Sequence, residues 1–113
     1  MSTDCHNKLI QVIRKAWEHL DAYIMEPYLS ENIHYYSWWA MADIRNKDTY
    51  LAYITERFRT YKECDTKVIV KLGVNKNDGE YAVALQVEDD YPVLIRIKEE
   101  NGMIKEMWMQ PAE

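Results

Sequence analysis

The hydrophobic positions near the N-terminus recur every three or four residues, as they do along one side of an α-helix. They are Leu9, Ile10, Ile13, Ala16, Trp17, Leu20 and Ile24. This stripe predicts an amphipathic helix whose apolar side packs on the rest of the protein, with an N-cap available among residues 2–4. Pro27 disfavours helical geometry in the residue before it, so we expect the helix to end near Met25 and Glu26.

A strand, an aromatic bend and a second helix follow one another between Tyr28 and Phe58. The residues of the strand alternate between two sets, which are Ile33, Tyr35 and Ser37 on one side and His34, Tyr36 and Trp38 on the other. Both sets carry large side chains. We therefore expect contacts on both faces of this strand, with a helix or a cavity on one of them.

The second helix is predicted from about Lys47, with Asn46 or Asp48 as its N-cap. Its apolar positions are Tyr50, Leu51, Ile54 and Phe58, while Glu56, Arg57 and Arg59 lie on other sides. The spacing is helical, so this element must also lie on an apolar surface.

The second half of the chain alternates between apolar and polar residues, which is the pattern of half-buried strands. The alternating segments are 68–74, 81–87, 93–97 and 104–109, separated by turn residues at 77–79, 89–90 and 101–102. Strands joined by tight hairpins are antiparallel neighbours. The two amphipathic helices are the only candidates to cover the apolar face of this sheet, so we expect an α+β fold in which a curved antiparallel sheet forms a cone with the helices on its concave face.

Length and charge narrow the class of protein. A chain of 113 residues is expected to form one domain over residues 1–113. The 14 basic and 19 acidic residues give a formal net charge of -5, and the basic residues are scattered. Phosphate binding draws on a concentrated basic face, so nucleic acid is not an expected partner.

The cysteines and the N-terminus predict a cytoplasmic protein. Cys5 and Cys64 are too few and too far apart for a disulfide framework, and we interpret both as free thiols. The N-terminal residues lack the apolar core of a secretory signal, and no run of residues approaches the length of a membrane helix.

A resemblance to a known family rests on the order of these segments. The chain resembles the nuclear transport factor 2-like superfamily in four segments. These are Leu29–Ser37, the loop with Trp38 and Trp39, the helix from about Lys47 and the strand Gly79–Ala84. The resemblance implies a cone-shaped fold, also called cystatin-like, with a pocket between sheet and helices and a homodimer formed through the outer face of the sheet. The superfamily includes ketosteroid isomerases, polyketide cyclases and dehydratases, and domains with no known catalysis.

The aromatic residues are the strongest feature of the composition, with four Trp, nine Tyr and one Phe. Trp17, Tyr35, Trp39, Tyr50 and Tyr53 could line a pocket with apolar walls, where their polar groups orient a ligand. The alternative is that these side chains fill an ordinary core and a dimer surface.

Ser37 stands where the resemblance places the catalytic carboxylate of the ketosteroid isomerase-like members. A hydroxyl is a poor general base unless a second group activates it. His34 lies on the opposite side of the strand from Ser37, and we interpret it as a packed or surface histidine. His6 and His19 are interpreted as solvent-facing, so no metal site is predicted.

Two further charged features are candidates for a site. The acidic run from Glu88 to Asp90 falls at a predicted turn, and we interpret it as solvated. Arg96 points away from Ile95 and Ile97, either into the cavity as an anchor for an anion or onto the outer face of the sheet, and the outer face is favoured.

These observations predict a domain that binds a small, largely apolar molecule in a tyrosine-rich cavity, without a cofactor and without assigned catalytic residues. The expected ligand-binding residues are Trp17, Tyr35, Ser37, Trp39, Tyr50, Tyr53 and Arg96. One alternative is an isomerase, cyclase or dehydratase in which Ser37, Tyr53 and either Arg96 or His34 polarise a carbonyl. Another is a homodimeric protein-interaction module, with a subunit contact on one face of the segment holding Met103, Met107, Trp108 and Met109.

Overall fold

Two long helices and six strands make up the part of the chain that the structure describes. The computed structural model describes residues 2–37 and 41–112. The elements in chain order are α1 (Ser2–His19), the 3-10 turns η1 (Ala22–Ile24) and η2 (Glu26–Tyr28), β1 (Leu29–Ser37), β2 (Ala42–Ile44), α2 (Lys47–Glu63), β3 (Val68–Val74), β4 (Tyr81–Val87), β5 (Val93–Glu100) and β6 (Met103–Pro111).

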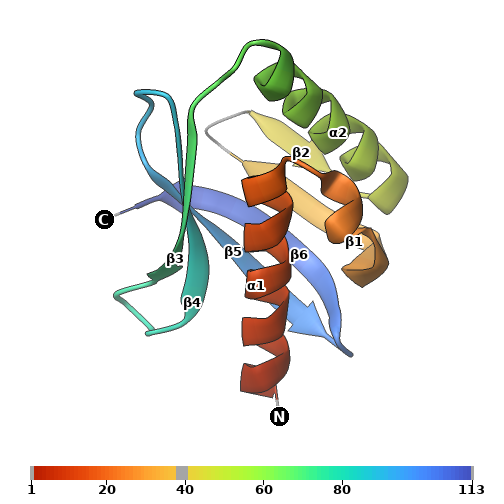
Figure 1. Cartoon of the computed structure of the whole chain (residues 1–113). Coiled ribbons are helices and arrows are strands. Elements are labelled where there is room, and N and C mark those ends of the chain that lie inside the picture. The colour runs from red at the N-terminus through yellow and green to blue at the C-terminus, as the bar shows by residue number, and fades with distance from the viewer. Residues whose placement is uncertain (1, 38–40, 113) are drawn as a thin grey trace.

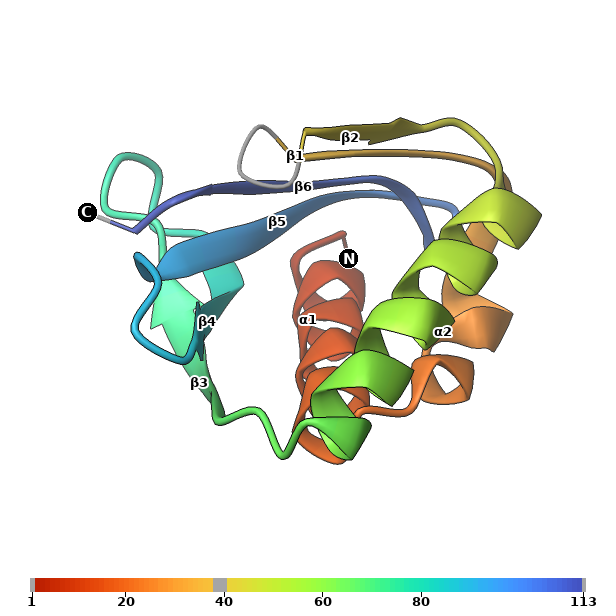
Figure 2. The ribbon, with the colours of Figure 1, turned by 90° about the horizontal axis from the view of Figure 1, so that it is seen from above.

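The strands form one curved sheet in the order β2-β1-β6-β5-β4-β3. Neighbouring strands are antiparallel except for β1 and β6, which run parallel. Seen from above, the sheet bends around α1 and α2, which both lie on its concave side (Figure 2). The predicted fold class is therefore confirmed, while the parallel β1–β6 pair was not predicted because it joins two distant segments of the chain.

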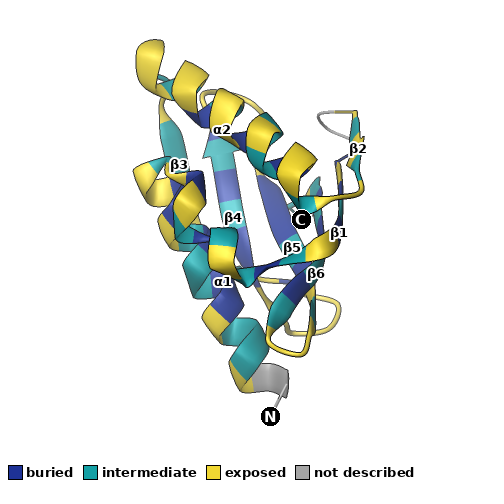
Figure 3. Cartoon of the chain, turned by 90° about the vertical axis from the view of Figure 1, so that its right-hand side faces the viewer, coloured by how far each residue is buried: buried dark blue, intermediate teal, exposed yellow. Residues whose placement is uncertain are grey.

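The core lies between the concave face of the sheet and the two helices. Figure 3 shows the buried side of α1, the buried side of α2 and the middle of the sheet facing one another. The large side chains that are buried most completely include Trp17, Tyr35, Tyr50, Leu9, Ile13, Met25, Ile33, Ile54 and Ile95. Their burial follows the helical and strand periodicities of the sequence, so the hydrophobic effect alone specifies which faces turn inward.

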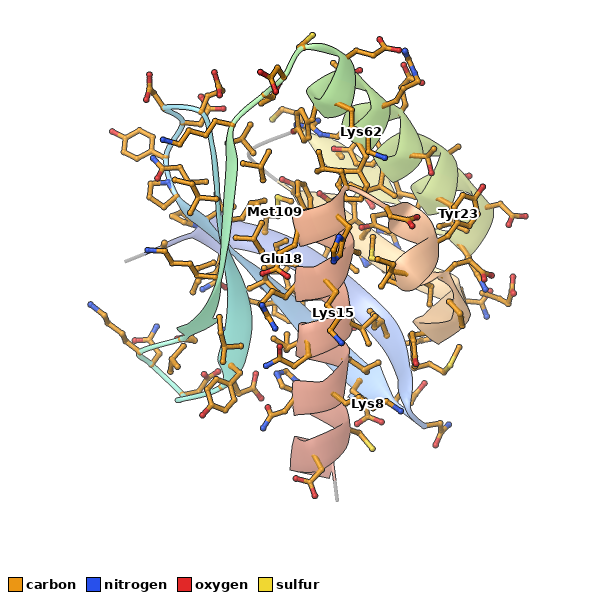
Figure 4. The ribbon with its side chains drawn as sticks, viewed as in Figure 1. Lys8, Lys15, Glu18, Tyr23, Lys62 and Met109 are labelled. Atoms are coloured by element: carbon orange, nitrogen blue, oxygen red, sulfur yellow. The ribbon has the colours of Figure 1, made fainter. Side chains whose placement is uncertain are left out.

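The outer sides of the helices are polar. Lys8, Lys15 and Glu18 are exposed and lie on the side of α1 that faces away from the sheet (Figure 4), whereas Met109 of β6 is buried. No helix in the described part of the chain is long and apolar enough to cross a membrane.

The first helix ends earlier than predicted. α1 stops at His19, and Leu20 adopts a left-handed backbone conformation with φ of 50°. The carboxylate of Asp21 then accepts a hydrogen bond from the backbone N–H of Tyr23 and starts the 3-10 turn η1. The apolar pattern continues through Ile24 because that residue still packs against the core, so periodicity alone concealed the break.

The N-cap of α2 is one of the two residues predicted for it, whereas β1 and β2 differ from the prediction. The Asn46 side chain accepts a hydrogen bond of 2.8 Å from the backbone N–H of Thr49, so Asn46 and not Asp48 is the N-cap of α2. β1 begins at Leu29, several residues before the predicted strand. The short strand β2 was not predicted, because its three residues are too few to show a period.

Candidate functional site

A cluster of hydroxyl groups and one guanidinium lies where α2 crosses the inner face of β1. Alternation along β1 turns both Tyr35 and Ser37 inward, and both are buried. Tyr53, Arg57 and Tyr61 follow one another at intervals of four residues, so they share one side of α2. We call these five residues the tyrosine–arginine cluster.

Arg57 is held between the two tyrosines of its own helix. Its Nη1 donates to the Tyr53 hydroxyl at 3.2 Å, and its Nε and Nη2 donate to the Tyr61 hydroxyl at 3.3 and 3.1 Å. The guanidinium carbon also lies 5.5 Å from the centre of the Tyr53 ring and 5.9 Å from that of Tyr61. The cation is therefore fixed in place and polarises both phenols.

Burial is the main cause that raises the pKa of Tyr35 well above its ordinary value. Hydrogen bonding with Tyr53 raises this pKa further, whereas hydrogen bonding with Ser37 and the charge of Arg57 lower it. The Tyr35 hydroxyl is thus hydrogen-bonded within the cluster, to Ser37 and Tyr53. Tyr35 therefore stays protonated at neutral pH and serves as a hydrogen-bond donor.

Burial alone would lower the pKa of Arg57, but hydrogen bonds and charge interactions with Tyr61, Tyr53 and Tyr35 leave that pKa above its ordinary value. The oxygen of Tyr53 accepts once from Arg57, and the oxygen of Tyr61 accepts twice from Arg57. Each of these phenols also carries one O–H of its own. The cluster thus presents donors and a positive charge, which suit a carbonyl or carboxylate oxygen.

Trp17 and Tyr50 lie deeper than this cluster and pack in the core. Trp17 is 1% exposed, and its ring meets that of Phe58 edge-on at 4.8 Å between centroids. The Tyr50 ring lies 5.0 Å from that of Tyr35, and its hydroxyl donates to the sulfur of Met107 at 3.5 Å. Both side chains fill the space beneath the helices. The predicted ligand-binding residue Trp39 lies outside the described residues.

Arg96 lies on the opposite face of the sheet from the cluster. The ladder aligns Arg96 of β5 with Trp108 of β6 and Tyr36 of β1, and alternation turns all three away from the buried Tyr35. Arg96 thus lies on the outer face of the sheet, as favoured from the sequence. It therefore does not share one site with Tyr53, which lies on the inner side. Arg96 instead lines a cavity of about 610 Å³.

The arrangement of the sheet and helices has clear counterparts among solved structures. An NTF2-like protein of unknown function from Mesorhizobium loti has a TM-score of 0.76 at 6% identity, over 100% of this chain and 95% of that chain. A SnoaL-like protein of unknown function from Burkholderia thailandensis has a TM-score of 0.74 at 12% identity, covering 100% of this chain and 99% of that one. The chain has the nuclear transport factor 2-like fold. An LEH-like epoxide hydrolase from M. tuberculosis shares this fold with a TM-score of 0.69 at 14% identity, over 99% of this chain and 86% of that chain.

The likeness lies in structure and not in sequence. No protein-family model and no curated protein matches the sequence. At these identities the nuclear transport factor 2-like fold is shown, but no chemistry transfers with it. A function can therefore be inferred only from the side chains of this protein.

The histidines occupy surface positions with local partners. His34 pairs with Asp43 at 2.9 Å between Nε2 and Oδ1, on the outer side of β1, so it does not join Ser37 and Tyr53. His6 is not simply solvent-facing as predicted, because its Nε2 lies 3.0 Å from the backbone oxygen of Tyr81. His19 is exposed. Among the described residues, no group of three or more His, Cys, Asp or Glu side chains is placed to hold a metal ion.

The acidic turn and the two cysteines lie apart from the tyrosine–arginine cluster. The acidic turn from Glu88 to Asp90 is exposed, and the Glu88 carboxylate accepts a hydrogen bond from the backbone N–H of Lys67. Cys5 and Cys64 are free thiols. These residues contribute nothing to the tyrosine–arginine cluster.

Arg57 is the residue of the cluster that was not expected from the sequence. It was placed with Glu56 and Arg59 on the polar side of the second helix, whereas the structure brings it under the neighbouring phenols. The signal that could have found it is the spacing of Tyr53, Arg57 and Tyr61, which stacks a cation between two aromatic rings on one side of a helix.

Proposed function

We propose that this protein binds a small, largely apolar molecule that carries one carbonyl or carboxylate oxygen. The oxygen accepts hydrogen bonds from the tyrosine–arginine cluster, while the apolar part lies against the partly buried rings of Tyr53 and Tyr61. Trp17 and Tyr50 support this site from the core and do not touch the ligand.

The observation that carries the proposal is the guanidinium of Arg57, fixed between two phenols at the edge of an aromatic core. A charge-assisted donor in such a partly desolvated place interacts more strongly with an anionic oxygen than it would in water. The Tyr53 and Tyr61 hydroxyls beside Arg57 each carry one O–H of their own. A carboxylate supplies the matching acceptors.

Replacing Arg57 by glutamine should weaken the binding of 2-naphthoate by at least about tenfold, because a hydrogen bond to a charged group contributes about 1.5–3 kcal/mol. The probe combines a flat apolar body with a single carboxylate, and isothermal titration calorimetry measures its affinity. The neutral 2-naphthamide should bind the wild-type protein more weakly than 2-naphthoate does.

Arg59→Gln is the matched control, because Arg59 lies on the same helix but is exposed and pairs with Glu56 and Glu63. This variant should retain the affinity of the wild-type protein. Equal weakening by both substitutions would mean that overall charge and not the cluster attracts the probe. Undetectable binding of 2-naphthoate to the wild-type protein would remove the proposal.

The geometry favours binding over the isomerase, cyclase or dehydratase alternative. Proton abstraction next to a carbonyl needs a base whose pKa lies near the working pH. Burial raises the pKa of Tyr35 and of Tyr50, which makes both poor bases. His34 and Arg96, the ionisable groups expected to assist Ser37 and Tyr53, lie on the other face of the sheet.

We further propose that the protein forms a homodimer through the outer face of the sheet. Tyr36 stacks on Trp108 there with 5.9 Å between ring centroids and 4° between planes, and it is still 37% exposed. The ring of His34 lies 4.9 Å from that of Tyr36. A flat strip of aromatic rings is typical of the centre of a subunit interface.

Tyr36→Glu should convert a dimer into a monomer, because the substitution places a charge in the centre of this strip. Native mass spectrometry reports the subunit count directly. Tyr91→Glu is the control, since Tyr91 is exposed at the turn between β4 and β5. A wild-type protein that is monomeric at micromolar concentration would contradict the proposed contact.

The protein-interaction module remains a prediction. The residues that such a module would use to contact a partner are Leu72 and Val74 of β3 and Tyr81 of β4. These large apolar side chains are exposed, and β3 is an edge strand of the sheet.

A further inference from the structure

The two edges of the sheet differ in how far they are protected from pairing with another strand. β2 is an edge strand of three residues, and its Asp43 is paired with His34 and Arg45. β3 lies at the opposite end of the sheet from β2 (Figure 1) and is seven residues long. Residues 68–74, all of which the structure describes, pair with β4 in an unbroken register and include no bulge and no proline. Short length, bulges and prolines normally block an edge, and β3 has none of these.

The backbone groups of β3 that face away from β4 can be assigned from the two ends of the β3–β4 hairpin. The N–H of Glu88 donates to the oxygen of Lys67, and the N–H of Asn75 donates to the oxygen of Glu80, at 2.8 Å each. In an antiparallel pair, residues that exchange such bonds alternate with residues that do not. The odd-numbered residues of β3 therefore bond toward β4. The N–H and C=O groups of Val68, Val70, Leu72 and Val74 point to the open edge, where no backbone group among the described residues bonds to them.

The far half of this open edge carries exposed apolar side chains. Leu72 and Val74 are 45% and 49% exposed, and Tyr81, the partner of Val74 in β4, is 42% exposed. Alternation places Leu72 and Val74 on the concave face, beyond the part of β3 where Val68 and Val70 pack against the core. Unpaired backbone groups thus lie next to a strip of accessible apolar surface.

Positive charge follows the same edge. Lys67, Lys71 and Lys76 are exposed, and residues 66–77 include no acidic residue. None of these three lysines forms a salt bridge with a described residue. The whole chain has a formal net charge of -5, so this basic run is a local exception. Its charge is complementary to an acidic partner.

The lysines make a second copy of β3 a poor partner for this edge. Pairing through the outward groups would set the even-numbered residues of one copy opposite those of the other. Lys67 and Lys71 of both copies would then lie together on the outer face of the joined sheet. Like charges opposite one another destabilise a strand pair, so the edge favours a foreign strand that carries acidic residues.

We propose that the open edge of β3 binds an extended peptide segment in which acidic and apolar residues alternate. The peptide adds a strand to the sheet and bonds to the outward N–H and C=O groups of β3. Its acidic side chains lie beside Lys67 and Lys71, and its apolar side chains lie against Leu72, Val74 and Tyr81. β3 lies at the other end of the sheet from β1, so this site is separate from the tyrosine–arginine cluster and from the proposed dimer contact.

Two capped peptides as long as β3 test the charge requirement, one that alternates valine with glutamate and one that alternates valine with lysine. In a titration of the ¹⁵N-labelled protein, the glutamate peptide should saturably shift the backbone amide resonances of Val70, Leu72 and Val74, at millimolar or lower concentration. The amides of Lys71 and Gly73, which bond toward β4, should shift less. The lysine peptide should bind at least about tenfold more weakly, because opposite-charge pairs become like-charge pairs. Equal affinity for both peptides, or no saturable shift, would overturn the proposal.

Leu72→Pro tests the backbone contact. Proline removes an N–H that faces the open edge and leaves the bonds to β4 intact, and edge strands tolerate proline at such a position. The variant should keep the circular dichroism spectrum of the wild type and bind the glutamate peptide at least about tenfold more weakly. Leu72→Ala, which keeps the N–H, should weaken binding less. An unchanged affinity in the folded proline variant would contradict strand addition.

N-methylated forms of the glutamate peptide give the same test without changing the protein. The valine amides of the bound peptide face β3 and the glutamate amides face water, so methylating the valine amides should abolish binding and methylating the glutamate amides should preserve it. Equal binding of the two forms would exclude strand addition. Native mass spectrometry tests the other occupant. A wild-type dimer that Leu72→Pro converts into a monomer, and Tyr36→Glu does not, would show that β3 pairs with a second copy and would overturn the proposal.

Discussion

Replacing Trp17 by alanine should lower the free energy of unfolding by about 3–5 kcal/mol, which is the usual cost of truncating a fully buried large aromatic side chain. Trp17 is 1% exposed, and its ring packs edge-on against Phe58 and lies 6.3 Å from the ring of Tyr61. The alanine variant would leave a cavity between α1 and α2 that the rigid surroundings fill only in part. Urea denaturation followed by circular dichroism measures the loss.

Trp17→Phe is the informative partner of this variant. The indole N–H of Trp17 is buried without a partner among the described residues, so phenylalanine removes an unsatisfied donor while keeping most of the apolar surface. We expect it to cost less than half as much as alanine. A loss below about 1 kcal/mol for Trp17→Ala would mean that this part of the core is not tightly packed.

Raising the pH above about 10 should destabilise the protein steeply because of two buried phenols. Burial raises the pKa of Tyr35, and burial raises the pKa of Tyr50 even though its hydroxyl contacts Met107. In the unfolded chain both phenols lose their protons near pH 10, whereas in the folded protein they keep them. The unfolded state then binds fewer protons, so stability falls as the pH rises, by about 1.4 kcal/mol per pH unit for each phenol.

Tyr50→Phe isolates this effect. The substitution keeps the ring in the core and removes one of the two titrating hydroxyls, so the slope of stability against pH should become shallower by about 1.4 kcal/mol per pH unit. Below about pH 9 the two proteins should differ little. Parallel slopes for both proteins above about pH 10 would show that the Tyr50 phenol ionises as readily in the folded state as in the unfolded one.

The elements that follow a long period were predicted well. The spacing alone predicted the inward positions of α2, β4 and β5, because burial of apolar surface acts on whole faces of an element. In β3, by contrast, Leu72 and Val74 of the alternating apolar set are exposed. The end of α1 was missed because a local contact decided it, namely the Asp21 side chain bonding to the N–H of Tyr23. Contacts of this kind leave the hydrophobic pattern intact.

Three of the residues expected to bind a ligand lie together in the structure. Tyr35, Ser37 and Tyr53 do come together, since their faces could be assigned from the alternation of β1 and the helical spacing of α2. Arg96 was predicted to share a cavity with these residues, but no sequence pattern linked it to them. Its register with Trp108 places it on the other face of the sheet. Arg57 was missed because charged residues on helices usually face water, and only its flanking tyrosines distinguish it from Arg59.

The most direct measurement of the central claim is a crystal structure of the protein with bound 2-naphthoate. Our account predicts that the carboxylate of the probe lies within hydrogen-bond distance of the Tyr53 or Tyr61 hydroxyl, beside Arg57, with the naphthalene ring against the two phenols. A probe found elsewhere on the molecule, with the tyrosine–arginine cluster unchanged from the unbound state, would contradict it.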